Sequence, residues 1–226
     1  MYKGIITGEV LTRVERMRLQ LRAVGLLRYL KDSYTYSFLA DVTGLDITVL
    51  NRYVKGRVVP SEEKARELIR VLGERFPLAE AIRHQVVPEP GDSVDLSLLG
   101  ENPALLVLVA DDVAGRFQSH EVDLVVTCDS AALAIQIAAR LNARSAIAVL
   151  GEDGKTLILR RRLVRPDDDV LIVDNVTDSG AGLHALKEAV QHARGQVLGA
   201  VVPVATTLFK RPKGTDSMPV RVMVEV

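Results

Sequence analysis

Apolar residues recur along the first third of the chain with the period of an α-helix. Between residues 14 and 30 they fall every three to four positions, with arginines between them, which predicts an amphipathic helix. Gly44 and Gly56 interrupt the pattern, and Ser61 before two glutamates is a favourable helix start. Three further helices are therefore predicted, over residues 36–42, 46–55 and 61–75.

From about residue 101 the pattern changes. Short apolar runs alternate with helical runs, which is typical of an α/β domain with a parallel sheet. An Asp-Gly pair at positions 153–154 predicts a hairpin turn between two of the strands. The predicted helices cover residues 103–117, 131–141 and 183–193, and the predicted strands cover residues 122–126, 143–150, 156–159, 170–173 and 197–205.

Length and composition agree with two folded units. The chain has 226 residues, of which 48% are hydrophobic and 26% charged, so it has the composition of a globular protein and is long enough for two cores. Between the two patterns, residues 87–93 hold two prolines, a glycine and polar residues, which indicates an irregular segment. We predict a helical domain over residues 1–76, a linker over residues 77–100 and an α/β domain over residues 101–226.

Charge and cysteine content change this interpretation little. The formal net charge is zero, but basic residues outnumber acidic ones over residues 1–30, so this end can still meet phosphate groups. Cys128 is the only cysteine, so no intrachain disulfide can form. We see no leader peptide and no apolar run that is long enough to cross a membrane. We expect a cytoplasmic protein that does not bind membranes.

Residues 36–55 carry the pattern of two helices that pack at a steep angle. Ala40 is small where the helices approach closely, and Gly44 lies at the turn, where it can adopt a positive φ. Asn51 and Arg52 would be exposed on the second helix, and such side chains suit bidentate contacts to adenine and guanine in the major groove. The segment resembles the repressor-type helix-turn-helix family; an ordinary helical hairpin is the structural alternative. The resemblance implies DNA contacts from Thr48, Asn51, Arg52, Lys55 and Arg57, the last two of them to phosphates.

The most informative segment follows the strand at residues 170–173. Asp174 stands at the carboxyl end of this strand, and a Ser/Gly-rich turn at residues 178–182 opens the next helix. The backbone N–H groups and the hydroxyl of such a turn, together with the helix N-terminus, favour an anion, whereas the upstream acid accepts hydrogen bonds from sugar hydroxyls. The segment therefore predicts one site for a phosphate and a ribose.

This segment resembles the phosphoribosyl pyrophosphate (PRPP) motif of type I phosphoribosyltransferases. The resemblance covers residues 103–204, with the elements in the same order, and implies that Asp174 and Asn175 face the ribose hydroxyls. It implies a 5′-phosphate loop made of Asp178, Ser179, Gly180, Ala181 and Gly182, and a pyrophosphate loop made of Thr127, Cys128, Asp129 and Ser130.

With the upstream helix-turn-helix, the chain is similar to the archaeal orotate phosphoribosyltransferase-like transcriptional regulators (GfcR-type). In the arrangement of its domains it is also similar to bacterial purine repressors built on the same fold. We therefore expect a DNA-binding regulator that senses PRPP or a related nucleotide ligand and binds double-stranded DNA as a homodimer. No cofactor is expected to be required, although Mg²⁺ can accompany PRPP. The histidines and Cys128 form no metal-ligand cluster, so no metal site is predicted.

Three departures from the family pattern favour binding over turnover. Asn175 replaces the second acid usual in the enzymes, Gly182 replaces a terminal threonine, and residues 152–155 form a short turn where the enzymes carry a long mobile loop. Lys155 and the arginines at 160–162 remain available as cations, or are solvated strand and turn residues. An active nucleobase phosphoribosyltransferase with an accessory DNA-binding domain is the alternative, followed by a salvage enzyme that binds RNA. No catalytic residue is assigned.

Two further features leave the ligand open. Gly180, Gly182 and Ala185 match a dinucleotide-binding fingerprint, but the first glycine follows the strand too late and the run at residues 197–205 holds no acid, which disfavours a nicotinamide or flavin enzyme. The base is not identified: a variable hood would hold it, and Phe209 either stacks on the base or packs in the core.

Overall fold

The structure is a computed structural model of the whole chain, and it describes residues 11–89, 93–95, 101–151, 157–159, 163–177, 180–206, 209 and 218–226. The chain divides into two compact units, Met1–Pro77 and Leu78–Val226. Across the described ranges, neither unit contains a helix that is long and apolar enough to cross a membrane.

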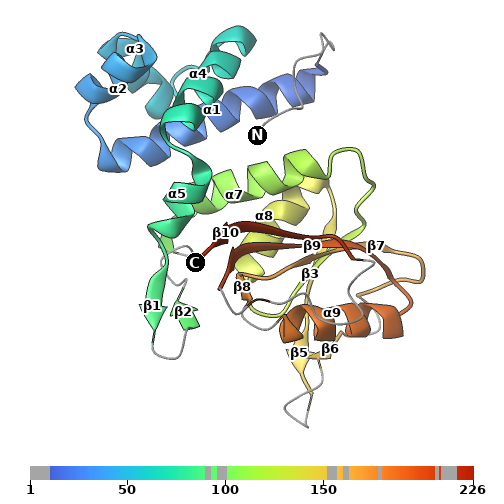
Figure 1. Cartoon of the computed structure of the whole chain (residues 1–226). Helices are drawn as coiled ribbons and strands as arrows, with labels where there is room; N and C mark the ends of the chain where they lie inside the picture. The colour runs from blue at the N-terminus through green and yellow to red at the C-terminus, as the bar shows by residue number, and fades with distance from the viewer. Residues whose placement is uncertain are drawn as a thin grey trace. The chain divides into compact units, whose positions relative to one another are not determined.

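The described part of the first unit is helical, as the sequence predicted (Figure 1). Its helices are α1 (Arg13–Ser33), α2 (Tyr36–Thr43), α3 (Ile47–Val54) and α4 (Glu62–Arg75). A polar residue before each helix accepts a hydrogen bond from a backbone N–H of the first turn, which satisfies a donor that the helix itself cannot. These capping residues are Thr12, Thr35, Asp46 and Ser61.

Leucines from all four helices form the core of the first unit. Leu27, Leu39, Leu50 and Leu68 are fully or almost fully buried against one another's helices. Gly44 ends α2 with φ +66° and donates its N–H to the Ala40 carbonyl oxygen at 2.8 Å. This left-handed cap turns the chain sharply, so that α3 can begin three residues later and still bury Leu50.

The apolar stripe of α1 is buried only in part. Val24, Leu27 and Leu30 are buried, whereas Val14, Met17 and Leu21 are more than half exposed. The sequence pattern predicted an amphipathic helix, which is present, and among the described residues only the second half of its apolar stripe is buried. Periodicity detects apolar positions but does not show whether another element packs against them.

The second unit begins with elements where the sequence indicated an irregular linker. They are α5 (Leu78–Arg83) and an antiparallel pair of strands, β1 (Val87–Glu89) and β2 (Ser93–Asp95). Strands of three residues, one of them containing Pro88, are too short to show an alternating pattern in the sequence. They are followed by α7 (Pro103–Arg116), whose N-cap is Asn102.

A parallel sheet forms the centre of the second unit. Its strand order is β10-β9-β7-β3-β4, and every neighbouring pair on this path is parallel, as the sequence predicted. The short strand β8 (Val176–Thr177) also pairs with β9 in parallel. The strands are β3 (Leu124–Thr127), β4 (Arg144–Ile147), β7 (Asp169–Val173), β9 (Gln196–Ala205) and β10 (Val220–Glu225).

Helices cover both faces of this sheet. Helices α7 and α8 (Ala131–Leu141) lie on one face, and α9 (Ala181–His192) lies on the other (Figure 1). Leu183 and Leu186 of α9 pack against alternate residues of the inner strands, because successive side chains of a strand point to opposite faces. These strand residues are Leu124, Val126, Val170, Ile172, Ala200 and Val202.

The connections of the sheet diverge between β3 and β7. From β3 the chain passes through α8 to β4 on one side, and from β7 it passes through α9 to β9 on the other side. In open α/β sheets the crevice outside the carboxyl ends of two such strands is the usual place for a ligand.

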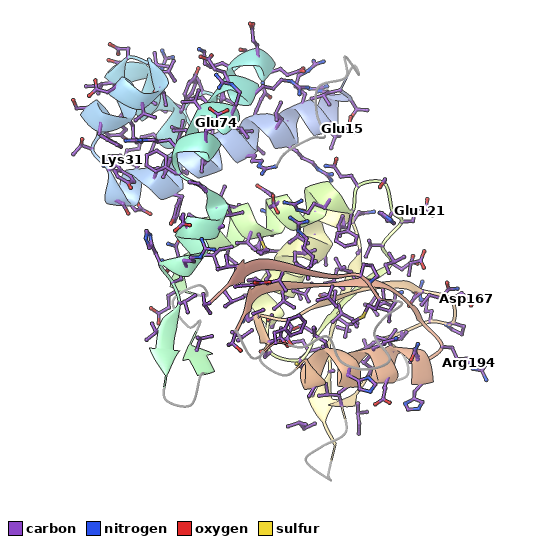
Figure 2. The ribbon with its side chains drawn as sticks, in the orientation of Figure 1. Glu15, Lys31, Glu74, Glu121, Asp167 and Arg194 are labelled. Carbon is purple, nitrogen blue, oxygen red and sulfur yellow. The ribbon has the colours of Figure 1, made fainter. Side chains whose placement is uncertain are left out.

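At the opposite edge of the sheet, the turns before β7 and β9 are joined by a backbone hydrogen bond: the Asp167 N–H donates to the Arg194 carbonyl oxygen at 3.0 Å (Figure 2).

The predicted hairpin is present. β5 (Val149–Leu150) pairs with β6 (Leu157–Ile158) in antiparallel register, with Val149 opposite Ile158. The sequence predicted one strand over residues 143–150, but β4 ends at Ile147 and β5 begins after Ala148. The turn residues 152–156, and with them Lys155, lie outside the described residues, as do the arginines at 160–162.

The cap at Gly44 leads to a test of the first unit. Gly44→Ala should lower the free energy of unfolding by about 1 kcal/mol, because alanine is strained at positive φ while its Cβ would meet nothing within 4 Å. Gly73→Ala is the matched control: its Cβ also meets nothing, but its φ is ordinary, so it should stabilise α4 by about 0.5–1 kcal/mol. Urea unfolding followed by far-UV circular dichroism measures both, and a shift of the same sign in the two variants would contradict the prediction.

Candidate functional site

The candidate site lies where β3 and β7 end. Thr127 is the last residue of β3, and Asp174 directly follows β7. Because these neighbouring strands are parallel, their carboxyl ends meet at one edge of the sheet. Both residues are buried, and α9 begins after Gly180 at this same edge.

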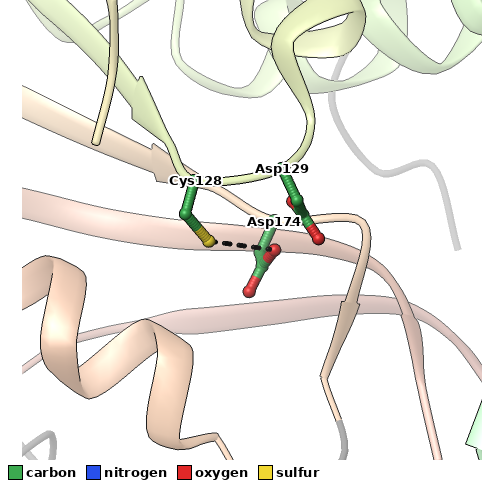
Figure 3. A group of neighbouring side chains, drawn as sticks. All are labelled: Cys128, Asp129 and Asp174. Carbon is green, nitrogen blue, oxygen red and sulfur yellow. Dashed lines mark hydrogen bonds between the residues drawn. The ribbon is translucent and has the colours of Figure 1, made fainter. Parts of the chain in front are cut away.

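Three side chains converge at this edge (Figure 3). The Cys128 thiol lies 4.0 Å from the Asp174 Oδ1 atom, and one ligand atom each of Cys128, Asp129 and Asp174 lie within 4.8 Å of one another. Asp129 is exposed, Cys128 is half-buried and Asp174 is buried. The Asn175 backbone N–H donates to Asp174 Oδ1 at 3.1 Å, which helps to orient that carboxylate.

The loop after β3 is bonded internally. The Ser130 N–H donates to the Thr127 hydroxyl oxygen at 2.8 Å, and the Ser130 hydroxyl donates to Asp129 Oδ1 at 2.8 Å. The Ser130 side chain makes no cap bond to α8, although Ser130 is the N-cap residue of this helix. The loop therefore directs a carboxylate toward the site, the Ser130 hydroxyl donates within the loop, and the Thr127 hydroxyl accepts there.

The start of α9 brings backbone N–H groups to the same edge, close to the Asp174 carboxylate. Gly180 is the N-cap with φ +74°, a conformation that glycine adopts without strain, and no side chain caps the helix. A Cβ at Gly182 would lie 3.4 Å from Asp174 Oδ2, so the absence of a side chain keeps this turn close to the carboxylate. N–H groups at the start of a twelve-residue helix favour an anion.

No protein-family model matches the chain. Over 98 residues it is 29% identical to orotate phosphoribosyltransferase of Caldicellulosiruptor bescii, a match that covers 42% of this chain and 51% of that enzyme. The chain thus spans about half the length of this curated relative.

Solved structures extend the similarity to the whole second unit. Adenine phosphoribosyltransferase of Rhodothermus marinus has a TM-score of 0.56 at 23% identity, covering 66% of this chain and 98% of its own. The enzyme of Thermoanaerobacter pseudethanolicus has a TM-score of 0.58 at 14% identity, and the match covers 66% of this chain and 99% of that enzyme. The enzyme of Leishmania tarentolae also has a TM-score of 0.58, at 13% identity, and the match covers 67% of this chain and 88% of that enzyme. The second unit has the type I phosphoribosyltransferase fold.

The residues that the resemblance assigned to the ligand gather at one edge of the phosphoribosyltransferase-like unit. Asp174 and Asn175 follow β7, Thr127 and its loop follow β3, and the glycines start α9. Asp178 and Ser179, predicted for the phosphate loop, lie outside the described residues. Cys128 and Asp129, from the loop that follows β3, lie next to Asp174, which follows β7 (Figure 3).

Some of the side chains at this edge are suitable ligands for Mg²⁺ and one is not. Mg²⁺ prefers oxygen ligands in an octahedral arrangement, and the carboxylates of Asp129 and Asp174 are suitable donors. The neighbouring Cys128 sulfur is not a suitable donor, because a protonated thiol is a poor ligand for a hard cation. The sequence predicted no metal site because that prediction rested on the spacing of His and Cys residues alone. Acids that follow separate strands show no such spacing.

Two residues after β9 belong to the stretch that the sequence offered for the hood over the base. Thr206 follows β9; its N–H donates to the Thr177 carbonyl oxygen at 3.0 Å, and its buried hydroxyl has no hydrogen-bond partner among the described residues. Phe209 is partly buried and packs against the hydrophobic core of the second unit, so of its two sequence interpretations the structure agrees with the core position. Periodicity offered no signal for either, because both follow the end of a strand.

In the first unit, the residues predicted to contact DNA lie on and just after α3. Thr48, Arg52, Lys55 and Arg57 are exposed, and Asn51 is half-buried. The three cations of this group form no ion pair with any residue in the ranges that the structure describes. Arg28 of α1 was not predicted to belong here, yet its Nε donates to the Val54 carbonyl oxygen at 2.8 Å and adds a fourth positive charge at the end of α3.

The environment of Cys128 leads to a test of the site. Burial, together with the neighbouring carboxylates of Asp174 and Asp129, raises the pKa of the Cys128 thiol to about 12. Since only the thiolate is alkylated, iodoacetamide at pH 8 should modify the folded protein at least about 100-fold more slowly than an ordinary cysteine, and the rate should rise as the pH approaches 12.

Mass spectrometry measures this modification, and the same protein unfolded in guanidinium chloride is the control, because Cys128 is the only cysteine in the sequence. Equal rates in the folded and unfolded protein would contradict this description of the site.

Proposed function

We propose that the chain is a DNA-binding transcriptional regulator whose phosphoribosyltransferase-like unit binds PRPP or a related nucleotide. The observation that carries this proposal is the exposed cationic surface of Arg52, Lys55 and Arg57 in a unit that is separate from the ligand-binding fold. A transferase acting on small molecules has no need of such a surface. In this proposal the protein acts in the cytoplasm, like the archaeal regulators that the sequence resembles.

The geometry of α2 and α3 supports DNA binding. Two eight-residue helices are joined by a turn whose left-handed residue is Gly44, and Leu50 anchors the second helix in the core. Thr48 and Arg52, one helical turn apart, are therefore presented together to the outside. A helix held in this way can enter the major groove with its polar side chains toward the bases, while Lys55 and Arg57 contact phosphates.

The ligand site supports the sensing role. Asp174 accepts hydrogen bonds from ribose hydroxyls in this proposal, with Asn175 beside it, while the start of α9 from Gly180 to Gly182 binds the 5′-phosphate. The curated relative is an orotate phosphoribosyltransferase and the structural relatives are adenine phosphoribosyltransferases, which supports a phosphoribosyl compound as the ligand. Mg²⁺ accompanies PRPP if PRPP is the ligand.

We propose a homodimer, because helix-turn-helix proteins commonly read two half-sites and closed two-fold symmetry supplies the second one. A ligand that favours one geometry of the dimer changes the spacing of the two α3 helices. This spacing couples ligand binding to DNA affinity without any direct contact between the two sites.

Reciprocal variants test the coupling. Arg52→Ala should weaken binding to the promoter DNA by about 1–3 kcal/mol and leave ligand affinity intact, because Arg52 contacts only base edges in this proposal. Asp174→Ala should leave DNA binding intact but remove its response to PRPP or nucleoside monophosphates, which in the wild type should amount to about 1–3 kcal/mol.

The measurement is a DNA titration by fluorescence anisotropy at fixed salt, because phosphate contacts make the affinity depend on salt. Arg70→Ala is the matched control: Arg70 is also an exposed arginine of the first unit, but it lies on α4 and pairs with Glu74 at 3.1 Å. Wild-type DNA affinity that is the same with and without every phosphoribosyl ligand would contradict the sensing role.

An active nucleobase phosphoribosyltransferase is the second candidate, and the sequence similarity to orotate phosphoribosyltransferase favours it. We expect little turnover, because Asn175 supplies no second carboxylate for the ribose. Release of pyrophosphate from PRPP with adenine, hypoxanthine, guanine, xanthine, uracil or orotate should be slower than about 1 s⁻¹. A coupled pyrophosphate assay with each base measures it, and faster turnover with any of them would make the enzyme the better description.

A further inference from the structure

One large apolar side chain lies among the polar residues of α3. Ile47 is the first residue of this helix and is 48% exposed. The structure describes the whole of α3, and every other apolar residue of the helix is buried or half-buried. Single exposed apolar residues are common on protein surfaces, so the position of Ile47 on the helix decides whether it has a role.

This position belongs to the end of the helix that reads bases. In a helix-turn-helix, residues at the N-terminal end of the second helix contact the base edges in the major groove. Side chains four positions apart are neighbours on a helix, so Ile47 stands in one row with Asn51, and Thr48 stands in the next row with Arg52. Ile47 therefore belongs to the same surface as the residues proposed to contact DNA.

Two interactions hold the first turn of α3 in place. The Thr48 N–H donates to Asp46 Oδ1 at 2.7 Å, which caps the helix. Leu50, three residues after Ile47, is fully buried in the core of the first unit. The side chain of Ile47 is branched at Cβ and thus already restricted, so a contact that covers it costs little additional conformational entropy.

The major groove offers one apolar group to such a side chain. The edges of the bases present hydrogen-bond donors and acceptors there, and the C5-methyl group of thymine is the exception. Ile47 has no polar side-chain atom, so covering the amino group of a cytosine would leave a donor without a partner, which costs free energy. Covering a thymine methyl group breaks no hydrogen bond and removes apolar surface from water.

We propose that Ile47 contacts the methyl group of a thymine in each half-site and thereby selects thymine at one position of the operator. This inference rests on the proposed function, because it requires that α3 enters the major groove. It adds an apolar contact to the polar base contacts of Asn51 and Arg52, and it explains why a large apolar residue occupies an exposed position on this helix.

The experiment removes this methyl group from the DNA, because deoxyuridine pairs like thymidine but lacks the C5-methyl group. The probe is a duplex that the wild-type full chain selects from a random-sequence pool. It is made with deoxyuridine in place of thymidine at one position of each half-site at a time, and binding is measured by fluorescence anisotropy at fixed salt. At one thymine position the substitution should weaken wild-type binding by about 4-fold for each half-site, the effect of one buried carbon.

Ile47→Ala should remove the dependence on the methyl group. The variant should bind the thymidine duplex at least about 4-fold less tightly than the wild type does, and the deoxyuridine duplex equally well as the thymidine duplex. Alanine favours the helix, so α3 should still form, which far-UV circular dichroism checks. If binding by this variant is too weak to measure, Ile47→Val, whose side chain is one carbon smaller, should show a reduced preference for thymidine instead.

Val14→Ala is the matched control. Val14 is also a branched apolar residue of the first unit and is 60% exposed. It lies in the first turn of α1, whereas Arg28, which bonds the end of α3, lies roughly 20 Å further along that helix. This variant should keep the wild-type preference for thymidine.

Three results would refute the role of Ile47 while DNA binding itself stands. They are selected half-sites without a thymine, wild-type binding that deoxyuridine leaves unchanged at every thymine position, and an Ile47→Ala variant that keeps the full wild-type preference. A wild-type protein that selects no DNA sequence from the pool would instead refute the proposed DNA-binding function, and this inference with it.

Discussion

The divergence of the chain at β3 and β7 is the constraint on which the candidate site depends. Because α8 returns the chain to one side of the sheet and α9 returns it to the other, the carboxyl ends of these two strands meet without a helix crossing between them. Thr127 ends β3, Asp174 directly follows β7, and both are buried, so the loops that follow start within the packed core. The chemistry of the site is then set by what each loop places at this edge.

Those loops place two kinds of polar group at this edge. Backbone N–H groups at the start of α9 suit a phosphate, while Asp129 and Asp174 suit hydroxyl groups or a cation. Burial, and after it the nearby carboxylates of Asp174 and Asp129, raises the pKa of the Cys128 thiol at this edge.

The first unit depends on a different constraint: the free backbone N–H and carbonyl groups at its helix ends need hydrogen-bond partners. Thr35 and Asp46 cap the starts of α2 and α3, Gly44 turns the chain between them, and Arg28 bonds the carbonyl oxygen at the end of α3. These short helices would not persist alone, since eight residues form too few internal hydrogen bonds. Caps and the buried Leu50 hold α3 in place, so that its polar side chains face outward.

The sequence by itself determined most of the helices, the parallel α/β pattern and the strand–acid–glycine segment around Asp174, because these features depend on local periodicity and on residues that are neighbours in the chain. Tertiary structure alone decided that half of the apolar stripe on α1 is exposed, that Phe209 packs in the core, and that Arg28 lies at the end of α3. It also decided that Cys128 and Asp174, 46 positions apart, lie side by side. The physical reason is that contacts between distant segments depend on strand order, and no local pattern specifies strand order.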